Sequence, residues 1–121
     1  MDAFTSRVIG CAIEVHRELG AGLLESSYES CLMHELALQG IQAYSQVVLP
    51  IHYKGIDVNA GYRLDILIPE QLIIELKAVD KLSPIHTAQL LTYLKLTGIK
   101  RGLIINFNVT RLVDGIKRVS L

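Results

Sequence analysis

Three charged side chains stand in a stretch that otherwise has the composition of buried strand. Asp65, Glu75 and Lys77 lie within residues 62–79, where most neighbours are leucine, isoleucine or valine. An ionised group that is buried without a partner is costly, so two carboxylates and an ammonium here indicate a functional cluster. Glu75 and Lys77 are two residues apart along a strand and therefore share a face. Two carboxylates and an ammonium together predict a metal site with a lysine beside it.

The two carboxylates are predicted to come from the two strands of one hairpin. Residues 69–71 have the composition of a turn. A three-residue loop centred there would place Ile68 opposite Leu72 and Asp65 opposite Glu75, with Cβ atoms about 5 Å apart. Carboxylates this close repel each other unless a cation lies between them. A slip of one residue would turn Asp65 to the other face, so the register is itself part of the prediction.

Three further polar residues lie in helix-like segments and could complete the site. Glu25 follows the glycine turn at Gly22 in the first turn of a helix, where the glycine lets the backbone pass close to another element. Gln89 and Tyr93 are four residues apart on a later helix and share a face, with His86 one turn earlier. Each has a purely structural alternative. Glu25 could complement a helix N-terminus, and Gln89 and Tyr93 could pack against a sheet.

The order of predicted elements is α-α-β-β-β-β-α-β, which favours an α/β fold with a mixed sheet. Thr5 and Ser6 are expected to cap the first helix, and Ser83-Pro84 and Gly98 should bound the last one, a parallel crossover. Residues 112–119 are ambiguous. The predicted helices cover residues 5–19, 24–40 and 84–97, and the predicted strands cover residues 42–49, 51–53, 56–58, 62–68, 72–79 and 102–107.

The length of 121 residues predicts a single domain over residues 1–121. No apolar run reaches the length of a membrane span, and the N-terminal residues lack the layout of a signal peptide, so we expect a cytoplasmic protein without membrane contact. Cys11 and Cys31 have apolar neighbours and are predicted to be free thiols.

The net charge is zero, but its distribution is uneven: residues 1–40 carry −4, residues 41–80 carry −2 and residues 81–121 carry +6. The basic third could face phosphates, with Lys95, Lys100 and Arg101 as candidate contacts. It could equally pair with the acidic first third, and charge alone does not decide.

Taken together, these residues resemble a known family. An aspartate, then about ten residues later Glu-x-Lys, an upstream helical glutamate and a downstream Gln-x-x-x-Tyr are similar to the PD-(D/E)xK nuclease superfamily. Within it, the run from Gly22 to Tyr28 (G-L-L-E-S-S-Y) resembles the GxxExxY protein family. The similarity continues through residues 12–20, 62–65, 75–79, 88–98, 103–107 and 114–118, which is nearly the whole chain.

The resemblance implies a restriction-endonuclease-like core, a mixed β-sheet flanked by α-helices. It implies that Asp65 and Glu75 ligate Mg²⁺ or Mn²⁺, with the Leu76 carbonyl and Glu25 as further ligands. Lys77 would then orient or deprotonate the attacking water. Gln89 and Tyr93 would line the site or contact the phosphate.

Three hypotheses follow from these observations. The first is a metal-dependent nuclease that acts on DNA or RNA, for which a two-fold dimer would enlarge a small binding surface. The second is a non-catalytic nucleic-acid-binding or assembly module that keeps the nuclease fold. The third treats the charged triad as a structural ion-pair network.

Overall fold

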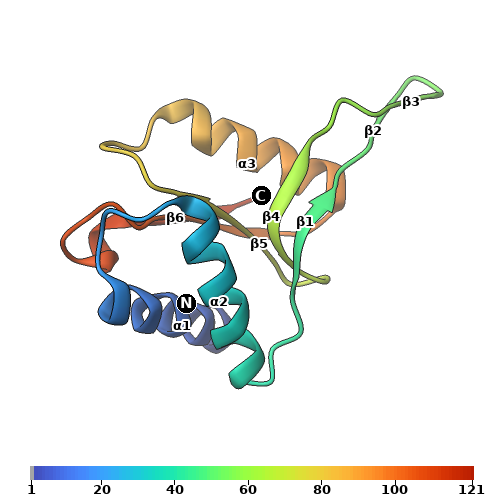
Figure 1. Ribbon diagram of the computed structural model, residues 1–121. Helices are drawn as coiled ribbons and strands as arrows, with labels where there is room; N and C mark the ends of the chain where they lie inside the picture. The colour runs from blue at the N-terminus through green and yellow to red at the C-terminus, as the bar shows by residue number, and fades with distance from the viewer. Residues whose placement is uncertain (1) are drawn as a thin grey trace.

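The computed structural model describes residues 2–121, which are built around a five-stranded mixed sheet (Figure 1). The strand order is β1-β4-β5-β6-β7, in which β5 and β6 are parallel and the other neighbours are antiparallel. Helices cover both faces of this sheet, so the predicted α/β architecture is confirmed. The strands are β1 Tyr44–Val48, β4 Arg63–Ile68, β5 Leu72–Lys77, β6 Arg101–Asn106 and β7 Ile116–Ser120.

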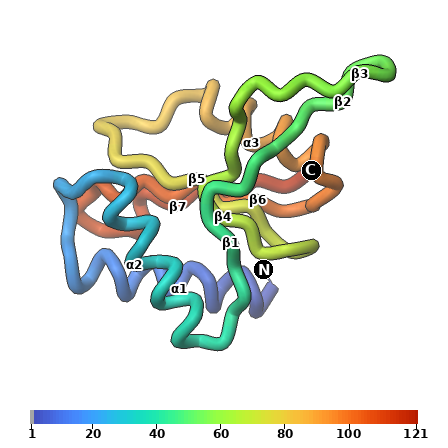
Figure 2. Tube along the Cα trace, turned by 45° about the vertical axis from the view of Figure 1, so that its right-hand side comes forward, coloured from blue at the N-terminus to red at the C-terminus, as the bar shows by residue number. Residues whose placement is uncertain are grey.

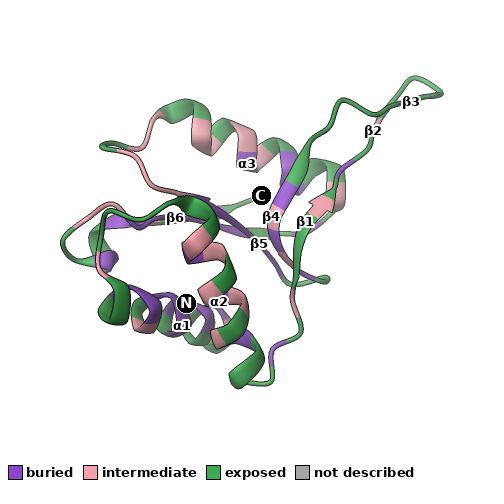
Figure 3. Ribbon diagram, viewed as in Figure 1, coloured by how far each residue is buried: buried purple, intermediate pink, exposed green. Residues whose placement is uncertain are grey.

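Two helices, α1 Ala3–Leu19 and α2 Glu25–Leu38, pack on one face of the sheet. Their apolar residues form the larger core with residues of β4, β5 and β6, and the buried residues of these strands are purple in Figure 3. The predicted cap of α1 is wrong. Asp2 is the N-cap, because its Oδ1 accepts the Thr5 N–H at 2.8 Å, one turn before the predicted start.

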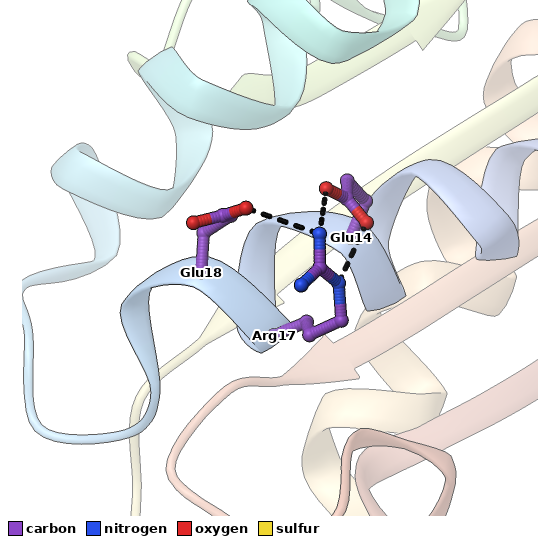
Figure 4. A network of polar contacts seen from close by, with 3 residues as sticks. All are labelled: Glu14, Arg17 and Glu18. Carbon is purple, nitrogen blue, oxygen red and sulfur yellow. Dashed lines mark hydrogen bonds and ion pairs between the residues drawn. The ribbon is translucent and has the colours of Figure 1, made fainter.

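The outer surface of α1 balances part of its own acidic charge. The Arg17 Nη2 lies 2.6 Å from Glu14 Oε1 and 3.0 Å from Glu18 Oε1 (Figure 4). Such exposed pairs contribute little to stability. Arg101 of the basic third pairs with Asp2 at 3.0 Å. The acidic first third is therefore neutralised partly from within and partly by the C-terminal third.

The opposite face of the sheet is covered by α3 Pro84–Thr97. Ser83 caps this helix, Pro84 opens it and Gly98 ends it in the left-handed conformation, all as predicted. The helix connects the parallel strands β5 and β6, so the predicted crossover is also confirmed. It lies close to the sheet at Gly102, where a Cβ atom would come within 2.8 Å of the Leu90 side chain.

Two segments lie at the margins of this layered core. The short hairpin of β2 Ile51–Tyr53 and β3 Ile56–Val58 projects away from the sheet as an arm, turning at the predicted Lys54-Gly55 (Figure 2). The segment that the sequence left ambiguous forms a 3-10 turn, Leu112–Gly115, followed by edge strand β7. Across residues 2–121, no helix combines the length and apolarity needed to cross a membrane. Both cysteines are free, as predicted.

Candidate active site

The β4–β5 hairpin has the predicted loop and register. Ile68 pairs with Leu72 and Ile66 with Ile74, and Glu70 at the centre of the loop has a φ of 66°. Continued by one more pair, this register sets Asp65 beside Glu75.

At Asp65 the backbone ladder is replaced by hydrogen bonds to carboxylates. The Asp65 N–H donates to Glu75 Oε2 at 2.9 Å, and the Leu76 N–H donates to Asp65 Oδ2 at 2.8 Å. The alternation of side chains along β4 is also broken here: Leu64 packs in the core on the α3 side of the sheet, whereas Ile66 packs in the core under α1 and α2. Residues two apart on a regular strand would share a face. Asp65 therefore occupies an irregularity that brings its carboxylate to Glu75.

Burial makes the Glu75 carboxylate unusually basic. Its residue is 6% exposed, and its pKa is raised to about 8, first by desolvation and then by the charge of Asp65. The Asp65 N–H and the Lys77 ammonium lower this pKa but do not cancel the rise. Lys77, on the same face of β5 and half-buried, is thus the nearby cation that partly compensates the pair.

The turn before α2 carries Glu25 toward the end of β5. Gly22 has a φ of 99°, and the buried Tyr28 holds the turn from inside: its hydroxyl donates to the Gly20 carbonyl at 2.6 Å and accepts the Leu23 N–H at 3.1 Å. Glu25 Oε2 accepts the Ala78 N–H at 3.3 Å, directly after Lys77.

From α3, Tyr93 approaches the same carboxylates. It is 6% exposed, and its pKa is raised by burial and then by the charge of Glu75. Gln89 is half-buried one turn earlier on this helix.

The three basic residues predicted to contact substrate lie elsewhere. Lys95 is exposed in the last turn of α3, and Lys100 and Arg101 are exposed at the start of β6. Glu75 pairs with Ile104 and Lys77 with Asn106, so Arg101 is three residues, about 10 Å, away from the level of Glu75. The structure therefore brings together Asp65, Glu75, Lys77, Glu25 and Tyr93. It leaves Lys100 and Arg101 at the other end of β6 and Lys95 at the end of α3.

A comparison with models of protein families shows which family this chain belongs to. The family model of the PD-(D/E)XK nuclease superfamily matches residues 2–119. The chain belongs to this superfamily. Its mixed sheet flanked by helices is consistent with the PD-(D/E)XK nuclease fold, which confirms the predicted restriction-endonuclease-like core. No curated protein and no solved structure matches the chain.

Sequence reasoning missed three residues of this PD-(D/E)XK chain, and two of them, Glu29 and Gln46, contact each other. Glu29 Oε1 accepts Gln46 Nε2 at 2.8 Å, and its pKa is raised by burial, with the charges of Asp65 and Glu25 adding to the rise. Gln46 stands opposite Asp65 by the β1–β4 register and has a φ of 53°, which is uncommon outside glycine. The spacing of Glu29, four residues after Glu25 on one helix face, was the available signal.

Asn106 was also missed, and it fixes the end of β5. Its side-chain amide donates to the Val79 carbonyl at 2.9 Å and accepts the Val79 N–H at 3.1 Å. The Phe107 N–H donates to the Lys77 carbonyl at 2.9 Å. Together these bonds hold the segment that carries Lys77 and the N–H bound by Glu25. A polar residue at the end of an otherwise apolar strand was the signal in the sequence.

The donor chemistry of the site fits a hard divalent cation. All the candidate side-chain ligands are carboxylates, and Asp65 and Glu75 each engage one oxygen, Oδ2 and Oε2, with a backbone N–H. A carboxylate has a second oxygen that can accept or ligate. A cation beside Glu75 would also offset the desolvation and repulsion that raise its pKa. Within residues 2–121, no three His, Cys, Asp or Glu side chains are already arranged as a metal site, so the predicted ligand set stays a prediction.

Proposed function

We propose that this protein hydrolyses phosphodiester bonds of DNA or RNA, using Mg²⁺ or Mn²⁺ held at Asp65 and Glu75. One observation carries the proposal: the two carboxylates meet where the β4–β5 ladder is interrupted, with Lys77 on the same face of β5 as Glu75. Membership of a nuclease superfamily supports the reaction class. We also propose, from the run Gly22 to Tyr28, that the chain belongs to the GxxExxY family.

The resemblance to the superfamily suggests a role for each residue of the site. Asp65, Glu75, the Leu76 carbonyl and Glu25 would hold the cation, which would polarise the phosphate and make a bound water a better nucleophile. Lys77 would orient that water and offset charge on the phosphate. Gln89 and Tyr93 would line the substrate side of the site.

Contacts with the rest of the substrate belong to the same proposal. Lys95, Lys100 and Arg101 would meet phosphates farther along the nucleic acid, and a two-fold dimer would extend this surface. Charge reversal at these three positions should then weaken binding and flatten its salt dependence. Unchanged affinity and salt dependence would show that these three residues do not contact the nucleic acid.

One observation favours a second candidate, a non-catalytic nucleic-acid-binding or assembly module that keeps the nuclease fold and in which the charged triad is structural. Asp65 and Glu75 already satisfy backbone N–H groups, which a carboxylate does as well in a scaffold as in an enzyme. The two candidates differ in what a cation does. An enzyme binds it and turns over, whereas a scaffold gains nothing from it.

The deciding experiment combines calorimetric titration with Mg²⁺ or Mn²⁺ and a cleavage assay on labelled DNA and RNA. Wild type should bind the cation and cut, and chelation should stop cleavage. Asp65→Ala should lose both, while Lys77→Ala should keep the cation and lose turnover by about 10² or more. Asp114→Ala, at an exposed acidic residue of the 3-10 turn, is the matched control. No heat of binding and no cleavage with wild type would establish the scaffold instead.

A further inference from the structure

Tyr62 lies between the arm and the candidate active site, three residues before Asp65. Its ring meets the ring of Tyr93 edge-on, with centroids 6.4 Å apart and planes at 63°. Tyr93 is 6% exposed, whereas Tyr62 is 42% exposed. Tyr62 therefore covers the buried tyrosine beside the carboxylates and presents much of its own ring to solvent.

The chain that leads outward from Tyr62 carries a second exposed aromatic residue. Tyr53, at the end of β2, is 57% exposed, and the Lys54 ammonium lies 5.3 Å from its ring centroid. The arm projects beyond both helical layers (Figure 2), so neither helix layer covers it. A two-stranded ribbon of this size is marginally stable alone. Tyr53 and Ile56 on this ribbon are therefore large apolar side chains that the helical layers leave uncovered.

Charge near the site favours a single strand over a duplex. Binders of duplex DNA commonly neutralise about 6–10 phosphates. Residues 51–80, which carry the arm and the two carboxylates, include only Lys54, Arg63 and Lys77 as lysines and arginines. Arg101, at the far end of β6, is paired with Asp2. Single-strand binding relies more on stacking, because every unpaired base offers a π-face to an aromatic side chain. A base inside a duplex has both faces covered by its neighbours and cannot stack on a tyrosine without being extruded.

We propose that the site takes an unpaired strand of nucleic acid, with a base next to the reacting phosphate stacked on Tyr62 and the strand continuing along the arm past Tyr53. This inference rests on the proposed nuclease function, because it names the substrate class of the same site. Tyr62 would be a specificity-determining residue, since its ring binds only a base whose face is free. Paired ends would be accepted only after fraying.

Binding can be measured apart from cleavage. Fluorescence anisotropy with Ca²⁺ in place of Mg²⁺ would use a labelled single strand of about 15 nucleotides, near the upper site size of one small domain, and the same strand annealed to its complement. We expect the single strand to bind at least about ten-fold more tightly than the blunt duplex. Tyr62→Leu should weaken single-strand binding by roughly five-fold or more, the usual scale for losing one stacked base, and Tyr62→Phe should retain it. Tyr44→Leu, at a tyrosine of β1 that is 46% exposed, is the control and should bind like wild type.

The outcomes separate this inference from the nuclease function. Single-strand binding that depends on Tyr62, without metal-dependent cleavage of any substrate, would support the inference and refute the hydrolysis. Cleavage of duplex that is unaffected by Tyr62→Leu would overturn the inference and leave the nuclease standing. Equal or tighter binding of duplex, or no binding of either probe, would also overturn it. Sedimentation of wild type and Tyr53→Ser adds one more outcome: a dimer that dissociates in the variant would assign the arm to a second copy of the chain and overturn its role in binding the strand.

Discussion

The metal-free protein should lose stability as the pH rises through the range in which the Glu75 carboxyl ionises. Its pKa in the folded chain is raised from 4.5 to about 8 by burial and by the charge of Asp65. Below the ordinary value, the folded and unfolded chains are both protonated at this residue. Between the two values, the unfolded chain releases its proton while the folded chain retains it. Stability therefore falls as pH increases, and the loss is complete above the folded pKa.

The size of this loss follows from the gap between the two pKa values. Each pH unit within the gap costs up to about 1.4 kcal/mol, so the whole effect is on the order of 4–5 kcal/mol. That is a large share of the roughly 5–15 kcal/mol that stabilises a typical domain. Glu29, whose pKa is also raised, adds to the loss in the same direction. Asp2 and Glu14 have lowered pKa values and act only at acidic pH, below the usual carboxylate range.

Glu75→Gln isolates the effect, because it removes the charge and keeps the shape. The side-chain oxygen of the introduced amide could still accept the Asp65 N–H. Urea unfolding in chelator, followed by circular dichroism at about pH 5, 7 and 9, runs from just above the ordinary pKa to above the folded one. Wild type should weaken steadily across this range. The variant should vary much less and exceed wild type by several kcal/mol at the highest pH.

Glu70→Gln is the matched control, since Glu70 is exposed at the tip of the same hairpin. Its pH profile should follow wild type. A wild-type profile that is flat between pH 5 and 9, or a decline of equal size in Glu75→Gln, would refute the argument that a buried, repelled carboxylate at Glu75 limits stability.

Three further predictions concern the surroundings of the site. Tyr28→Phe removes the hydroxyl that bonds to two backbone groups of the turn before α2, so urea unfolding should show a loss of about 1–3 kcal/mol in the free energy of unfolding. Cleavage should also fall, because this turn positions Glu25. Unchanged stability would mean that the turn does not depend on the tyrosine hydroxyl. Gln46→Gly relieves the strain of a positive φ, so it should raise the melting temperature by the equivalent of about 1 kcal/mol. The same change should lower cleavage activity, because Glu29 loses its amide partner. A less stable variant would show that the amide contact outweighs the strain. The rise in melting temperature produced by Mg²⁺ should be larger at about pH 8.5 than at about pH 6, because the cation must displace the Glu75 proton, and a rise independent of pH would place the cation elsewhere.

The sequence was sufficient to predict the frame of the site because its determinants are local. The turn composition of residues 69–71 set the β4–β5 register, and Ser83, Pro84 and Gly98 marked the ends of α3. The crossover followed from one helix between two apolar strands. These features depend on neighbours within a few residues, which a single sequence displays.

Details that depend on competition between distant groups were not predictable in the same way. The interruption at Asp65 arises because two carboxylates accept N–H groups that strand carbonyls would otherwise bind. The spacing of apolar residues along the sequence does not indicate where this happens. The contact of Gln46 with Glu29 joins residues that are distant along the chain. At α1, Asp2 and Thr5 could each act as a cap, and the earlier residue does so because its carboxylate reaches the Thr5 N–H.

The hydrogen bonds of Asp65 and Glu75 bear on both interpretations of the triad. A purely structural network would be expected to use the carboxylates fully, yet each gives one oxygen to a backbone N–H, through Oδ2 and Oε2. These bonds fix the orientation of each carboxylate. Their donors are backbone N–H groups, which remain when a neighbouring side chain is substituted. Pre-oriented ligands lose less freedom on binding than mobile ones. The cost of this arrangement is visible in the raised pKa of Glu75. Because a bound cation would reverse that cost and a scaffold would retain it, stability with and without divalent metal is the measurement in which the two interpretations differ most.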